Sequence, residues 1–154
     1  MNLTKNFTLA EMTKSETALR HGIDNTPGEQ EISALKVLAE KVLQPIRDHF
    51  QKGVKVNSAY RSPEVNAKVG GSRTSDHCRG QAADIEIPGV ANAELAQWIV
   101  DNLEFRQVIL EFYTQGIPDS GWVHVSYVPE DNKKQVLTAI KKDGKTVYLN
   151  GLVA

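Results

Sequence analysis

The longest periodic pattern in the sequence predicts an amphipathic helix between Thr26 and Gly53. The segment Thr26-Pro27-Gly28-Glu29 has the residues that begin helices: a threonine N-cap, a proline at the first helical position and a glutamate three residues after the cap. Pro45 lies inside the pattern, which predicts either a kink or two abutting helices there. The apolar residues recur at a spacing that places one stripe against a core; they are Ile32, Leu35, Leu38, Val42, Leu43, Ile46 and Phe50.

Short strands and helices follow the long helix without a regular alternation. This order is typical of an α+β fold rather than a doubly wound sheet, so we predict an α+β fold. Asp143-Gly144 predicts the turn of a terminal hairpin. Thr8 with Glu11 predicts a capping box at a short first helix, and residues 15–25 read as irregular. Strands are predicted at 54–58, 83–87, 106–113, 122–128, 136–140 and 146–149, with further helices beginning at Ser62 and near Asn92.

Composition and charge narrow the range of partners and locations. The chain of 154 residues has the length of one ordinary domain, and we expect residues 1–154 to form one. The net charge of −1 provides no basic field for nucleic acid or anionic lipid. Cys78 is the only cysteine, so no intrachain disulfide is expected. Because no apolar stretch suits a signal peptide or a membrane span, we expect cytoplasmic synthesis and no membrane partner. We also expect a monomer.

Three polar residues occupy positions that indicate a metal site. His77 ends a polar, glycine-containing loop, and Asp84 follows inside an apolar strand, where a carboxylate is unfavourable unless it is paired or bound to a cation. His124 lies in a third segment, on one strand face with Trp122 and Ser126. Two imidazoles and a carboxylate are a donor set that would suit an open zinc site with a vacant fourth position. On spacing alone, a satisfied structural histidine and an aspartate that accepts backbone hydrogen bonds are the commoner interpretation.

A longer pattern contains all three residues: Ser75-x-His77-x-x-Gly80-x-Ala82-x-Asp84, followed further along the chain by Trp122-x-His124. Four other segments belong with it: Asn6-Phe7-Thr8-Leu9-Ala10-Glu11-Met12, Gly22-Ile23-Asp24-Asn25-Thr26-Pro27, Leu43-Gln44-Pro45-Ile46-Arg47 and Ser58-Ala59-Tyr60-Arg61-Ser62-Pro63. Together these motifs resemble the zinc D-Ala-D-Ala carboxypeptidase family of metallopeptidases, peptidase family M15, and especially its phage endolysin-type branch. The resemblance covers nearly the whole chain. It implies a hedgehog/DD-peptidase fold, a small antiparallel sheet flanked by helices, with His77, Asp84 and His124 as ligands of Zn2+.

The resemblance also implies roles for residues beside the metal. Arg61 matches an arginine that faces the substrate and stabilises the oxyanion, as expected of a fixed cation near developing negative charge. Ser75 matches a position near the substrate. Trp122 is expected beside the zinc site as a substrate-binding residue, with a purely structural role in the core as the alternative. Cys78 is expected to point away from the metal.

The general base is the least determined role. Many members of the family have an acidic residue three positions before the last histidine, and this chain has Gly121 there. Glu111 and Asp119 are the two alternatives. We favour Glu111 because an acid within an apolar strand requires a reason, whereas Asp119 lies in a proline-containing loop and is compatible with a turn.

The resemblance implies that the substrate is a peptidoglycan stem peptide, cut at a terminal D-Ala, a cross-bridge or the L-Ala–D-Glu bond. The expected role is lysis of the cell wall after phage-type release through a membrane lesion, or wall remodelling. Gly121 in place of an acid favours a rival interpretation: a zinc-binding module of the same fold, without catalysis, used for binding or virion structure. A third interpretation is a metal-free structural protein.

Overall fold

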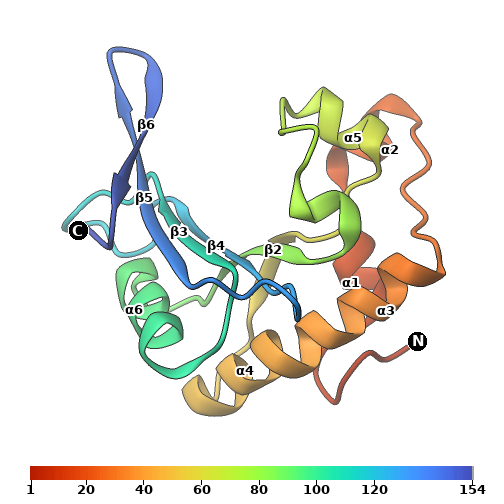
Figure 1. The fold of residues 1–154 in the computed structure, drawn as a ribbon, viewed down its shortest axis with the longest axis horizontal. Helices are drawn as coiled ribbons and strands as arrows, with labels where there is room; N and C mark the ends of the chain where they lie inside the picture. Colours follow the sequence, from red (N-terminus) through yellow and green to blue (C-terminus); the bar gives the residue numbers. More distant parts are fainter. Residues whose placement is uncertain (154) are drawn as a thin grey trace.

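A computed structural model describes residues 1–153, and in it the expected long helix is one rod that changes helical type midway (Figure 1). The rod consists of α3 (Glu29–Leu38), the π-helical segment η1 (Ala39–Leu43) and α4 (Gln44–Phe50). Pro45 falls in the first turn of α4, directly after the wide π turn. A wider turn accommodates a residue that cannot donate a hydrogen bond to the turn before it. The prediction of abutting helical segments at Pro45 is confirmed.

Both ends of this rod differ from the prediction. Thr26 does not cap the helix, because its backbone N–H and its hydroxyl both donate to the carboxylate of Asp24, at 3.0 and 2.6 Å. The N-cap is Gly28, and the Glu31 carboxylate accepts its N–H at 3.0 Å. At the other end the helix stops at Gln51, which adopts a left-handed conformation.

The N-terminal segment contains two short helices. The capping box of Thr8 and Glu11 begins α1 (Leu9–Thr13), as predicted. The prediction that residues 15–25 are irregular was wrong, because they include α2 (Glu16–His21). The Ser15 side chain caps this helix by accepting the N–H of Ala18. Position 18 is not a glutamate, so the sequence lacks the capping box that would have indicated a helix start.

The sheet is mixed rather than purely antiparallel. Its strand order is β1-β2-β4-β3-β5-β6, and every neighbouring pair is antiparallel except β3 and β5. The expected antiparallel sheet is therefore corrected at this one pair. The chain leaves β4 and passes the residues just before β3, where the N–H of Lys134 donates to the carbonyl of Phe105 and that of Gln135 to the carbonyl of Arg106. The start of β5 therefore lies beside the start of β3. The strands are β1 (Lys55–Ser58), β2 (Ala82–Glu86), β3 (Gln107–Glu111), β4 (Trp122–Ser126), β5 (Gln135–Lys142) and β6 (Lys145–Asn150).

The two faces of the sheet have different environments. One face packs against the α3–α4 rod and against α6 (Asn92–Asn102), as Figure 1 shows. The resulting α+β fold confirms the predicted class, and the predicted hairpin is present as β5 and β6. No helix among residues 1–153 is long and apolar enough to span a bilayer. The buried side chains between helices and strands include Leu35, Leu38, Val42, Ile46, Leu95, Ile99, Ala83, Ile85, Val108, Leu110, Val123 and Val125.

Candidate metal centre

Strand register brings the polar residues of three strands into adjacent rows on the face that is not covered by the rod and α6. Asp84 of β2 pairs with His124 of β4, which pairs in turn with Ile109 of β3. One row further, Glu111 of β3 pairs with Trp122 of β4. Since side chains two residues apart in a strand share a face, these residues all line one cleft.

His77 reaches the same cleft from a short helical turn above β2. Ser75 caps this 3-10 turn, η2 (Asp76–Arg79), and its hydroxyl accepts the N–H of His77 at 3.2 Å. Gly80 ends the turn in a left-handed conformation, and a side chain there would approach the backbone oxygen of Glu31 within 2.5 Å. Only glycine therefore allows η2 to sit this close to α3.

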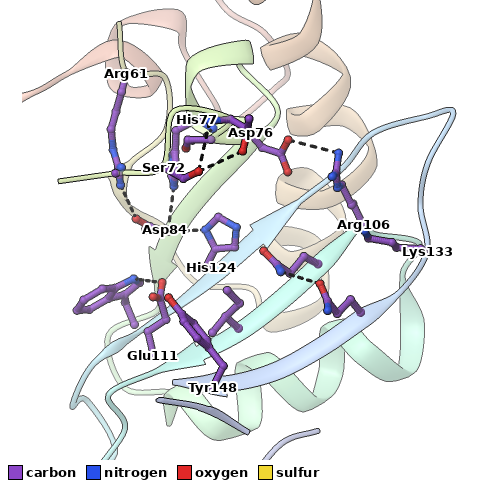
Figure 2. A pocket seen from close by; sticks show the side chains of 17 residues that line it. Arg61, Ser72, Asp76, His77, Asp84, Arg106, Glu111, His124, Lys133 and Tyr148 are labelled. Carbon is purple, nitrogen blue, oxygen red and sulfur yellow. Dashed lines mark hydrogen bonds and ion pairs between the residues drawn. The ribbon is translucent and has the colours of Figure 1, made fainter. Parts of the chain in front are cut away.

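Three ligand atoms converge at the centre of the cleft (Figure 2). His77 Nε2 lies 3.4 Å and His124 Nδ1 lies 3.0 Å from the same oxygen of Asp84, Oδ1. The three atoms lie within 4.8 Å of one another. Tetrahedral zinc with bonds of about 2.0–2.1 Å holds its ligand atoms roughly 3.3 Å apart, so the donor set and its spacing fit a zinc ion.

The second ring nitrogen of His77 fixes which atom faces the cleft. His77 Nδ1 lies 2.7 Å from the carbonyl oxygen of Ala59, which can only accept, so Nδ1 carries the hydrogen. In a neutral ring, Nε2 then presents a lone pair toward a carboxylate oxygen. That arrangement requires a proton or a cation between the two atoms, which supports a metal-binding role.

Arg61 closes one side of this group. Its guanidinium donates to Asp84 Oδ2 at 3.2 Å, while its Nε donates to the Ser58 hydroxyl at 3.0 Å and Nη1 to Asn66 Oδ1 at 3.3 Å. Three partners hold the cation at the edge of the cleft, beside the oxygen of Asp84 that faces away from the imidazoles.

Burial and the interactions between them shift the pKa values of Asp84 and His124. Burial acts to raise the pKa of Asp84, but hydrogen bonds with His124 and His77, and their charges, lower it below its ordinary range. For His124, burial acts to lower the pKa, and the hydrogen bond and charge of Asp84 outweigh it, so the pKa is raised. Without metal, the cluster therefore favours an ionised carboxylate beside a protonated imidazole.

We predict that zinc affinity depends steeply on pH. Below the raised pKa of His124 zinc must displace a proton, so apparent affinity should rise about tenfold per pH unit and then level off above that pKa. The same proton adds to the free energy of unfolding of the metal-free protein. This stabilisation is complete below about pH 6.5 and is lost as the pH rises through the raised pKa of His124. Competition with a chelator at several pH values measures the affinity. An affinity that stays constant between about pH 5.5 and 7 would contradict this assignment.

Of the two predicted bases, only Glu111 lines the cleft. Its carboxylate accepts the indole N–H of Trp122 at 2.7 Å, which fixes its direction. Burial, followed by the negative charge of Asp84, raises the pKa of Glu111. Asp119 is exposed in the loop between β3 and β4 and does not line the cleft. The geometry therefore favours Glu111, with Trp122 as its hydrogen-bond partner.

The backbone at Gly121 explains why no acid occupies that position. Gly121 has a φ of +65°, and a Cβ there would overlap the carbonyl oxygen of Glu111. The neighbouring Phe112 adopts a left-handed conformation at the same point. The cleft still contains an acid although position 121 is a glycine, because Glu111 of the adjacent strand lines it.

A Gly121→Ala substitution is expected to lower the free energy of unfolding by about 3 kcal/mol, because strain at positive φ adds to a backbone overlap. Gly116→Ala is the matched control: Gly116 has a φ of +89° but nothing lies within 4 Å of an added Cβ. The control should lose only about 1 kcal/mol. Urea unfolding measures both, and equal losses would contradict the proposed overlap.

The cleft also contains residues that sequence analysis did not single out. Ser75 lines it as predicted, and Cys78 lies outside it. The added residues lie on either side of the ligands, and the three that follow β4 have no motif that would have marked them. They are Gly71, Ser72, Thr74, Arg106, Gln107, Ile109, Lys133, Gln135 and Tyr148.

The fold and the donor set define a metallopeptidase-type site: three convergent ligand atoms, an acid beside them and an arginine at the edge of an open cleft. Residues 5–126 match the family model described as peptidase M15. The chain belongs to the peptidase M15 family, in which zinc dependence is general. A search of curated proteins found no match.

Proposed function

We propose that this chain is a zinc peptidase that hydrolyses peptide bonds in peptidoglycan stem peptides. The observation that carries the proposal is the composition of the cleft: three protein ligand atoms and an oriented carboxyl, Glu111, line the same open space. Structural zinc sites usually have four protein ligands, whereas catalytic sites have three and an open position. The His-Asp-His set is of the second kind.

Each group of residues in the cleft would have a separate role in peptide hydrolysis. Zinc bound by His77, Asp84 and His124 would act as a Lewis acid and lower the pKa of water. Glu111 would accept a proton from the attacking water and pass it to the leaving amine, a task that its raised pKa suits. Arg61 would stabilise negative charge on the carbonyl oxygen of the substrate.

The proposal of a wall peptide as substrate is supported by the resemblance of the chain's motifs to those of zinc D-Ala-D-Ala carboxypeptidases of the endolysin type. The cleft is compatible with a polar peptide, since serine, threonine and glutamine side chains line it beside the charged ones. Cleavage of a terminal D-Ala, a cross-bridge or the L-Ala–D-Glu bond would each fit this proposal. Phage-type release would bring the protein to the wall.

Zymography on purified cell wall tests the proposal. The zinc-loaded protein should clear the wall, and removal of zinc with a chelator should stop clearing until zinc is restored. Zinc-loaded protein that binds the metal stoichiometrically and clears nothing would instead favour a zinc-binding module without catalysis.

A further inference from the structure

One wall of the cleft comes from a part of the chain outside the family match. Residues 5–126 match the family model, whereas Lys133, Gln135 and Tyr148 lie beyond it and still line the cleft. They come from the connection before β5, from β5 itself and from β6. A substrate that contacted this wall would therefore meet residues outside the matched region.

Register explains how this wall reaches the site. Glu111 of β3 pairs with Ala139 of β5, and Ala139 pairs with Tyr148 of β6. Ala139 is small and fully buried. Figure 2 shows the Tyr148 side chain extending from β6 toward Glu111. At the start of β5, the side-chain amide of Gln107 donates a hydrogen bond of 2.8 Å to that of Gln135, and both residues line the cleft.

The two cationic side chains at this end of the cleft, Arg106 and Lys133, differ in whether acidic side chains already pair with them. Arg106 lies 3.6 Å from carboxylate oxygens of both Asp76 and Asp131, which together offset its charge. Lys133 is exposed and, among residues 1–153, forms no ion pair or side-chain hydrogen bond. At the other end, Arg61 is held by Asp84. Lys133 is thus the cation of the cleft that remains free to meet an anion.

We propose that Lys133, which lines the same cleft as Gln107 and Gln135, binds a free carboxylate of the peptide substrate and makes the protein prefer stem peptides with free side carboxyl groups over amidated ones. This inference rests on the proposed function for the identity of the peptide. An amide has no charge for the ammonium of Lys133 to attract. The preference should be moderate, because the ammonium is exposed to solvent and screened by salt.

The test is a binding measurement, so that it does not depend on cleavage. Two synthetic stem peptides, with all side carboxyl groups free or all converted to amides, are titrated by calorimetry into zinc-loaded Glu111→Gln protein. The free acid should bind about fivefold more tightly than the amide. Lys133→Gln should reduce the affinity for the acid to that for the amide, and Lys133→Arg should keep the preference.

Lys134→Gln is the matched control. Lys134 is the next residue in the chain, but its ammonium pairs with Glu104 at 3.0 Å and it does not line the cleft. Its replacement should leave the preference unchanged. Equal binding of the two peptides, or a preference that survives Lys133→Gln, would overturn the inference. Wild-type protein that shows this preference but clears no cell wall would support the inference while rejecting the proposed peptidase activity.

Discussion

Replacement of His77 by alanine is expected to abolish both stoichiometric zinc binding and peptide hydrolysis. His77 is only 4% exposed, and its Nε2 faces the cleft because Nδ1 is hydrogen-bonded to the carbonyl oxygen of Ala59. No other imidazole or thiol lies close enough to replace it among the described residues. Loss of a metal ligand should cost more affinity than the roughly 10–100-fold that loss of a supporting group costs. Elemental analysis after dialysis measures the zinc, and wall clearing measures the activity.

His21→Ala is the matched control for this change. His21 is exposed at the end of α2, outside the cleft, so the variant should bind one zinc ion per chain and clear wall like the wild type. Circular dichroism would show whether both variants are folded. A folded His77→Ala protein that still holds one zinc ion per chain would remove His77 from the ligand set.

Glu111→Gln is expected to lower the rate of peptide hydrolysis by about 10²–10⁴-fold while leaving zinc bound. The amide has nearly the same shape and can still accept the indole N–H of Trp122, but it cannot accept a proton from water. The variant should therefore lose kcat and keep its zinc content, a combination that loss of folding would not produce.

Asp119→Asn provides the comparison for this second prediction. Asp119 is exposed and outside the cleft, so its amide variant should retain wild-type rates. An inactive Asp119→Asn protein together with an active Glu111→Gln protein would reverse the assignment of the general base.

Strand alternation predicted part of the site. It placed Asp84 on a polar strand face, and placed His124 with Trp122, because side chains two residues apart share a face. It could not show that these faces meet, since that depends on the pairing of Asp84 with His124 between strands far apart in sequence. The choice between Glu111 and Asp119 also depended on strand pairing, because the pairing of Glu111 with Trp122 brings Glu111 into the cleft.

Other features had no local signal. The parallel pairing of β3 and β5 arises from the path of the connection after β4, which no turn motif marks. Lys133 lies in that connection, so its place in the cleft follows from topology rather than from residue pattern. The helix α2 was missed because it is six residues long and its cap lacks the glutamate of a capping box.

X-ray absorption at the zinc edge of the fully loaded protein tests most directly whether the His77, Asp84 and His124 side chains share one ion. We predict a first shell of nitrogen and oxygen at about 2.0–2.1 Å, with outer-shell scattering from two imidazole rings. A sulfur neighbour at about 2.3 Å, which would involve Cys78, or a shell without imidazole scattering would contradict the assignment.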